Sequence, residues 1–191
     1  WARARSVVRG FTLTGGRAML ASSGGNNDTV AGGIFGWSTP DGAIAEDCII
    51  SNNCAKNGAG AMYVNLRRCR IIENRVVDAG YGPAVHTCPL TGCFVDRNYG
   101  NDTAIYPTRI ESTTFGPNNY NTYGSAVRFI VGYGGTVSIP VLNSVFCRGY
   151  LGDGQCYIYA TNSVFNAEFF GDASTYSRVF ATNCCNCVVT N

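Results

Sequence analysis

A short pattern that recurs roughly every 20 residues constrains the fold of this chain more than any other sequence feature. It is clearest in residues 66–74 (LRRCRIIEN), where small Cys69 is followed by apolar Ile71 and the segment closes on Asn74. Part of this segment alternates apolar and charged residues with the period of two that a strand with one buried face requires. The segment therefore reads as one strand of a repeating unit.

The small residue, which we call the anchor, recurs along the whole chain. The anchors are Cys48, Cys69, Cys93, Ser112, Ser144, Ser163 and Cys184, and Phe11 takes their place at the start. The residue two positions later is usually apolar, and the residue five later is Asn in three consecutive repeats. These asparagines are Asn53, Asn74 and Asn98. We expect the anchors and apolar residues to stack in a core, and each Asn to bond to backbone and to the Asn of the next repeat.

A second strand, often introduced by Gly, precedes most anchors. These strands are expected at 33–35, 61–63, 84–85, 104–106, 126–127 and 157–158. With Gly and Asn at the corners and no helical periodicity, the chain is predicted to be all-β. We predict a right-handed parallel β-helix, or solenoid, of about eight coils without substantial helix. Leucine-rich repeats have a similar length, but their leucine-dense consensus fits poorly with small anchors and an asparagine ladder.

The predicted solenoid is a single domain over residues 1–191, and we expect it to be a segment of a longer chain or assembly. Loop insertions rich in Gly, Asn and Pro are expected near 17–31, 36–43 and 116–124. The terminal coils would expose unpaired backbone, so other copies of the chain or flanking coils are the expected partners that cover them.

The repeats resemble those of a known class of bacterial surface protein. Gly-x-Ala-Val-like strands such as 58–62 and 82–85 alternate with apolar-x-x-Asn segments such as 71–74 and 95–98. This alternation is similar to the right-handed β-helix repeats of polymorphic outer-membrane and autotransporter passenger proteins, and more distantly to the pectate-lyase-like superfamily. The resemblance implies a fold and a surface location, and no catalytic residue carries over from it.

The composition limits the cellular locations and the binding partners that we expect for this protein. Only 14% of residues are charged and the net charge is +2, so no nucleic-acid partner is expected. No apolar run is long enough to span a membrane. The chain has 10 cysteines, and together with the resemblance they favour an extracellular or cell-surface protein.

The cysteines fall into two groups. The anchors Cys48, Cys69, Cys93 and Cys184 are predicted to pack as a structural ladder. The candidates for disulfide bonds are Cys88, Cys93, Cys147 and Cys156, with Cys54 and the 184–187 cluster as further options. No metal is predicted, because the 184–187 cluster has neither a second ligand pair nor a nearby His. The sequons at Asn27 and Asn101 permit glycosylation if the source is eukaryotic.

Charged residues at equivalent positions of adjacent repeats should pair on the outer surface. The repeat places Asp47 beside Arg68, Glu46 beside Arg67 and Glu73 beside Arg97. A solvated, neutralised outer wall is the simplest interpretation of these pairs.

A structural or adhesive role is the function that the sequence favours, with end-to-end assembly as one form of it. The aromatic residues on loops are candidates for stacking on the sugar rings of a polysaccharide or glycan. They are Trp37, Tyr120, Tyr123 and Tyr133. The Thr12-x-Thr14 pair of an ice-binding face does not recur on later repeats.

The alternative is a carbohydrate-active enzyme, a polysaccharide lyase or glycoside hydrolase, on the same fold. Its catalytic candidates are Asp96 and Arg97, because proton abstraction needs a base and a cation opposite the developing charge. No cofactor is expected, apart from Ca²⁺ under the lyase alternative. The single histidine, His86, is predicted to be a surface or corner residue without a catalytic partner.

Overall fold

A computed structural model of the chain describes residues 6–18, 30–36, 42–119, 127–130, 137–146, 150–153, 156–171 and 178–190. From residue 127 onward, side chains are described only at 139–146, 159–164 and 182–184, and the side chain of residue 79 is also left out. Within these residues every regular element is a strand and every strand pairing is parallel. The predicted all-β class is therefore confirmed.

One sheet contains eight strands, each paired with the equivalent strand of the neighbouring repeat. In spatial order they are β1 (Val7–Arg9), β5 (Ala43–Glu46), β9 (Val64–Arg67), β13 (Leu90–Thr91), β16 (Ile110–Glu111), β19 (Val137–Leu142), β22 (Cys156–Thr161) and β24 (Arg178–Thr182). Spatial order equals chain order throughout, so each return of the chain adds one strand to the same edge.

The 14-stranded sheet consists of two such runs that meet at the long strand β23. The first run is β2 (Thr12–Thr14), β6 (Ile49–Ser51), β10 (Arg70–Ile72), β14 (Phe94–Asp96), β17 (Thr114–Phe115), β20 (Val145–Phe146) and β23 (Val164–Gly171). The second is β21 (Tyr150–Asp153), β18 (Val127–Ile130), β15 (Ala104–Ile105), β12 (Val85–His86), β8 (Ala61–Met62) and β4 (Ile34–Phe35). A further strand, β25 (Cys185–Thr190), pairs with β23.

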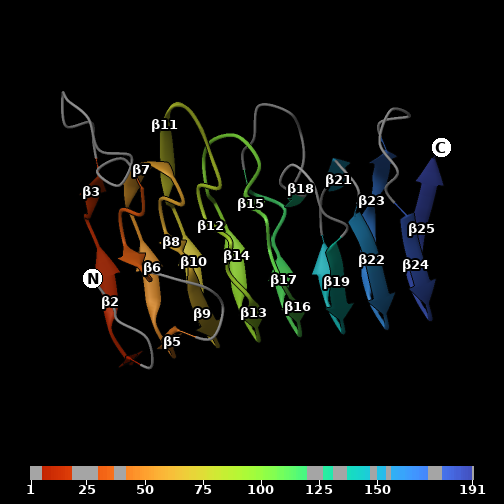
Figure 1. Cartoon of the computed structure of the whole chain (residues 1–191), viewed down its shortest axis with the longest axis horizontal. Helices are drawn as coiled ribbons and strands as arrows, with labels where there is room; N and C mark the ends of the chain where they lie inside the picture. The colour runs from red at the N-terminus through yellow and green to blue at the C-terminus, as the bar shows by residue number, and fades with distance from the viewer. Residues whose placement is uncertain are drawn as a thin grey trace.

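A third sheet is formed by β11 (Arg75–Tyr81), β7 (Cys54–Asn57) and β3 (Arg17–Ala18). In its first three turns the chain visits the sheets in the same order: β5, β6, β7 and β8 lie in the first, second, third and second sheets, and β9 returns beside β5. From β13 onward the described strands alternate between the first and second sheets only. Figure 1 shows the strands following one another along the longest axis, with the two termini at opposite ends.

The core lies between the sheets and is built from one or two inward side chains per strand. Its largest fully buried members include Leu66, Ile71, Leu90, Phe115 and Phe146. Phe115 and Phe146, in register on neighbouring strands, stack with ring centroids 5.1 Å apart and an interplanar angle of 8°. Inward residues at equivalent positions therefore stack from repeat to repeat.

The anchors sit just after a left-handed corner and close it with a hydrogen bond. Cys69 Sγ donates to the Arg67 carbonyl at 3.3 Å, and Ser144 Oγ donates to the Leu142 carbonyl at 2.8 Å. The residue before the anchor has φ between 49° and 75°. This left-handed backbone brings the carbonyl of the residue two positions before the anchor within hydrogen-bonding distance of the anchor side chain. The anchor must be small enough to fit inside the corner and must donate one hydrogen bond, so Cys, Ser and Thr substitute for one another.

One predicted anchor is wrong by a residue. Ser112 is exposed and has φ 49°, so it occupies the left-handed corner, and Thr113 is the buried anchor. Thr113 Oγ1 donates to the Glu111 carbonyl at 2.9 Å and accepts from the Cys93 amide at 3.3 Å. Small polar residues suit both positions, which is why the sequence alone misplaces this anchor. Phe11, by contrast, is in register with Cys48 but is 61% exposed.

The other departures from prediction lie at the edges of elements. Residues 17–18, expected in a loop, form β3 and pair with β7. Residue 43, expected in the second loop, begins β5. The strand expected at 157–158 belongs to β22 of the eight-stranded sheet, whereas its counterparts in earlier repeats lie in the 14-stranded sheet.

Candidate functional site

An asparagine ladder forms the corner behind the candidate site. Asn53 Nδ2 donates to Asn74 Oδ1 at 3.0 Å, and Asn74 Nδ2 donates to Asn98 Oδ1 at 3.1 Å. The oxygens of Asn74 and Asn98 also accept from the backbone amide of the preceding Asn, whereas Asn53 Oδ1 accepts from the Gly16 amide. Each Asn nitrogen donates to a carbonyl one repeat back. The ladder holds successive corners in one register.

The ladder extends one step beyond the three residues identified from the sequence. Asn98 Nδ2 donates to Asn119 Oδ1 at 3.1 Å, and Asn119 is buried. Asn119 lies six residues after its anchor Thr113, whereas Asn98 lies five after Cys93. The turn at 117–118 adds one residue, so a search at a fixed spacing stops at Asn98.

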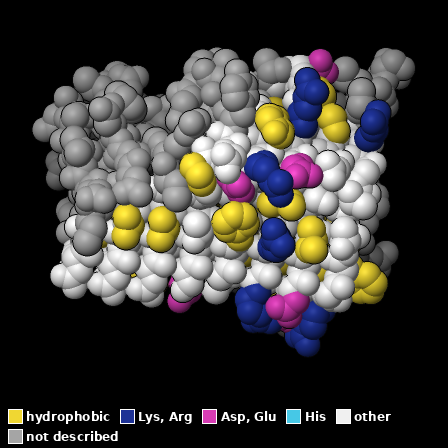
Figure 2. All heavy atoms as spheres, turned by 180° about the vertical axis from the view of Figure 1, so that it is seen from behind, with side chains coloured by type: hydrophobic (Ala, Val, Ile, Leu, Met, Phe, Trp, Pro, Cys, Tyr) yellow, Lys and Arg dark blue, Asp and Glu magenta, His cyan; other side chains and the backbone are white. Residues whose placement is uncertain are grey.

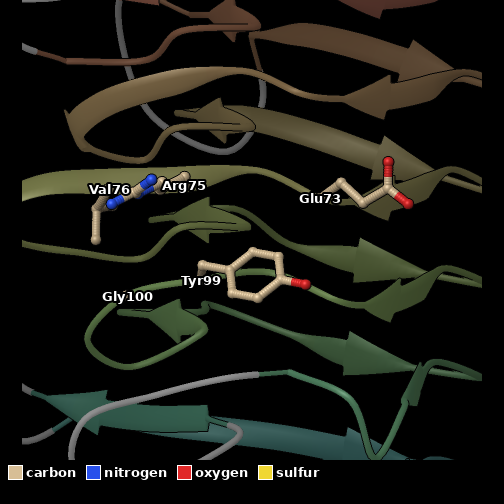
Figure 3. Close-up of a pocket in the computed structure, with 5 residues that line it drawn as sticks. All are labelled: Glu73, Arg75, Val76, Tyr99 and Gly100. Atoms are coloured by element: carbon tan, nitrogen blue, oxygen red, sulfur yellow. The ribbon is translucent and has the colours of Figure 1, made fainter.

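A groove of about 580 Å³ opens on the outer surface beside this corner. It is lined by Glu73, Arg75, Val76, Tyr99 and Gly100, and Figure 3 shows the Tyr99 ring lying between the ends occupied by Glu73 and by Arg75 and Val76. Gly100 has φ 146°, and a Cβ there would lie 1.9 Å from Val76 Cγ2. Only glycine therefore allows the two coils to approach closely enough to form this wall.

The catalytic candidates lie next to this groove but do not form an acid–base pair. Asp96 is 6% exposed and accepts hydrogen bonds from the Asn118 amide at 2.9 Å and from Asn118 Nδ2 at 3.1 Å, so both its oxygens are occupied. Arg97 instead forms an ion pair with Glu73 at 3.0 Å. In this arrangement Asp96 stabilises a turn, and Arg97 cancels the charge of the groove carboxylate.

Ion pairs between repeats follow two of the three expected partnerships. Arg68 Nε lies 2.8 Å from Asp47 Oδ1, and the Glu73–Arg97 pair is present. Glu46 and Arg67 are neighbours in register, as predicted, but the ion pairs of Glu46 are made with other arginines. Glu46 bonds to Arg68 and to Arg9, because the left-handed backbone of Arg68 turns its side chain back toward the preceding repeat.

This cluster spans three repeats and shifts the carboxylates' titration. Hydrogen bonds from Arg68 and then Arg9 hold the pKa of Glu46 below its ordinary value, and Arg68 likewise lowers the pKa of Asp47. Figure 2 shows basic and acidic side chains intermingled over the described part of the face seen from behind. The paired charges stabilise neighbouring coils only modestly, since every member of the cluster except Glu46 is exposed.

The cysteines whose bonding is described are free thiols: Cys48, Cys54, Cys69, Cys88, Cys93 and Cys184. The bridge predicted between Cys88 and Cys93 is therefore absent. Cys88 Sγ donates instead to the His86 carbonyl at 3.3 Å, in the same way that an anchor closes its corner. Burial raises the pKa of Cys88 to about 12, and contact with Cys69 together with burial raises the pKa of Cys93. Cys88 and Cys93 are therefore protonated packing residues at neutral pH.

His86 is half-buried in a column of aromatic rings rather than on the open surface. Its ring centroid lies 6.3 Å from that of Tyr63 and 5.2 Å from that of Tyr106, and Nδ1 lies 2.8 Å from Thr87 Oγ1. Burial lowers the pKa of His86 to about 4 from the ordinary 6.5. The ring is therefore neutral at physiological pH.

We expect the single histidine to titrate only in acid. Its NMR ring signals should stay constant from neutral pH down to about pH 5 and shift with a midpoint near 4. Between 6.5 and 4 the unfolded chain binds a proton that the folded chain does not, so stability should fall as pH falls through this range. A ring midpoint close to 6.5 would contradict the buried position.

Of the remaining candidates, the structure describes Asn101 but not the loop aromatic residues. Asn101 is 8% exposed and Thr103 of its sequon is fully buried, which leaves little room for a glycan on the folded chain. The positions outside the described residues are Asn27, Trp37, Tyr120, Tyr123, Tyr133 and Cys147. The side chain of Cys156 is likewise not described, although its backbone lies in β22.

Among the described residues, no three His, Cys, Asp or Glu side chains are grouped so as to hold a metal ion. The same part of the chain contains no helix able to cross a bilayer. Comparison with protein-family models, with curated proteins and with solved structures found no match. The site must therefore be interpreted from its own chemistry.

Proposed function

We propose that the chain is a right-handed parallel β-helix of about eight coils that serves as an extracellular or cell-surface structural and adhesive module. The regular return of the chain to the eight-stranded sheet after each visit to the 14-stranded sheet, with every described pairing parallel, supports this winding. Parallel crossover connections are right-handed in nearly all proteins, which supports the hand.

The observation that carries the functional proposal is how the polar side chains beside the groove are used. Glu73 is neutralised by Arg97, Asp96 is held by Asn118, and the asparagines bond to one another. Glycosidases need two carboxylates facing the scissile bond, and lyases need an available base. The described residues around the groove offer a binding surface, which favours adhesion over the enzyme alternative.

Assembly with other copies or with flanking coils is part of the same proposal. In the eight-stranded sheet, β1 pairs only with β5 and β24 only with β22 among the described strands. An open strand edge can accept a strand from a neighbour, so stacking end to end is the expected mode.

An activity assay separates adhesion from catalysis. The chain is incubated with uronic-acid polymers and neutral polysaccharides, while absorbance from unsaturated product and the number of reducing ends are followed. We expect neither signal to rise above that of the buffer. A rise in either signal that scales with protein concentration would replace the adhesive role with the enzymatic one.

A further inference from the structure

The third sheet presents a row of outward side chains in register that continues onto the groove. Arg17 is paired with Cys54, Cys54 with Arg75, and a further bridge joins Arg75 to Tyr99. Arg17 and Arg75 are exposed, Cys54 is half-buried and Tyr99 is 45% exposed. We propose that this row and the groove bind a linear anionic polysaccharide lying along the long axis of the molecule.

Among the described residues, the cations of this row lack acidic partners, a property that they share with Arg67 on β9 and Arg70 on β10 but that only they combine with a place beside the groove. Neither Arg17 nor Arg75, nor the exposed Lys56 two residues along from Cys54, forms an ion pair within the described part of the chain. Arg9, Arg68, Arg97 and Arg109 all do. The groove carboxylate of Glu73 is already matched by Arg97, so it does not offset Arg75. The row therefore carries positive charge available to an external anion.

The aromatic member of the row suits a sugar ring. Tyr99 lines the groove together with Val76 and Gly100 (Figure 3). The apolar C–H face of a pyranose packs well against an aromatic ring. The acidic substituents of the sugar form charge-assisted hydrogen bonds with guanidinium groups. Tyr81, 39% exposed at the far end of β11, offers a second aromatic surface on this sheet.

The geometry favours a repeating ligand over a single small anion. Neighbouring strands lie about 4.8 Å apart, so Arg17 and Arg75, two strands apart, are separated by about 10 Å along the axis. A polysaccharide also repeats its acidic groups at regular intervals of one or two sugar rings. Because the sheet fixes the row before the ligand arrives, little ordering is required on binding.

Binding of labelled oligosaccharides to variants of the whole chain tests this inference. The probes are a heparin oligosaccharide bearing sulfates, an oligogalacturonate bearing carboxylates and a neutral glucan of equal length. Arg75→Glu should weaken binding of an anionic probe at least about tenfold. The matched control is Arg70→Glu, an exposed arginine on β10 of the same coil but outside the groove lining, and it should change affinity less than about twofold.

Further variants distinguish a specific row from general charge. Arg75→Lys should restore much of the binding lost in Arg75→Glu, and Tyr99→Ala should weaken it about tenfold while Tyr159→Ala, of similar exposure, does not. Preference for the sulfated or the carboxylated probe identifies the acidic group. Equal losses for Arg75→Glu and Arg70→Glu, equal binding of the neutral glucan or of a single-stranded oligonucleotide, or no binding at all would overturn the inference.

This inference rests on the proposed adhesive role, but different experimental results would contradict the inference and the proposed role. If the chain cleaves the probe yet Arg75→Glu still weakens binding, the row stands and the proposed function falls. If the chain neither cleaves nor binds any probe, the row falls and the structural part of the proposed function stands.

Discussion

Replacing Asn74 by alanine is expected to lower the free energy of unfolding by about 3–5 kcal/mol. Asn74 is fully buried, and its amide group contacts Asn53, Asn98 and the Ile50 carbonyl. Truncation removes the acceptor of the Asn53 backbone amide and the donor to that carbonyl, both away from water, and leaves Asn53 Nδ2 with only its bond to the Leu13 carbonyl. Each buried group left unsatisfied costs about 1–3 kcal/mol.

Chemical denaturation followed by circular dichroism measures this loss. The matched control is Asn65→Ala on the same coil, because Asn65 is half-buried in β9 and none of its side-chain atoms takes part in the ladder. We expect the control to cost less than about 1 kcal/mol. Equal effects of the two variants would show that the ladder does not stabilise the fold.

Truncation of Phe115 to alanine should have a comparable effect, about 3–5 kcal/mol. The Phe115 ring is fully buried and stacks on Phe146, so its removal leaves a cavity between two repeats that the surrounding strands cannot close. The loss should appear as a lower denaturation midpoint with cooperative unfolding retained.

Phe94→Ala is the natural comparison for this variant. Phe94 occupies the neighbouring strand β14, one position out of step with Phe115, and is 37% exposed because it points to the outer surface. We expect its truncation to cost less than about 1 kcal/mol. A larger cost for Phe94→Ala than for Phe115→Ala would invert the assignment of inner and outer faces.

The sequence predicted the framework well because its signals are local and repeat. A small anchor, an apolar residue two positions later and an Asn five later define one strand and its corners, and the repeat spacing then places Asn53, Asn74 and Asn98 in one column. The column holds in the structure because neighbouring repeats with equal strand lengths have one register available to them. Asn119 was missed because one extra turn residue breaks the fixed spacing.

The contacts within the site were harder to predict, because they depend on the direction in which each side chain points at the left-handed turns between strands. Arg68 bonds to Glu46 only because its own backbone is left-handed, a state that sequence rarely reveals for an arginine. Asp96 and Arg97 are adjacent in sequence yet point to different partners, Asn118 and Glu73. The row of Arg17, Cys54 and Arg75 emerges only when β3, an unexpected strand, pairs with β7.

Nuclear Overhauser contacts between successive coils test the winding of the chain most directly. In a stacked parallel arrangement Ile71 lies between Ile50 and Val95, so its backbone protons should show contacts with both, 21 and 24 residues away. The equivalent pairs Leu66 with Ala45 and Leu90 should show the same pattern. Contacts that instead pair these strands in antiparallel order, or an absence of contacts between coils, would contradict the account.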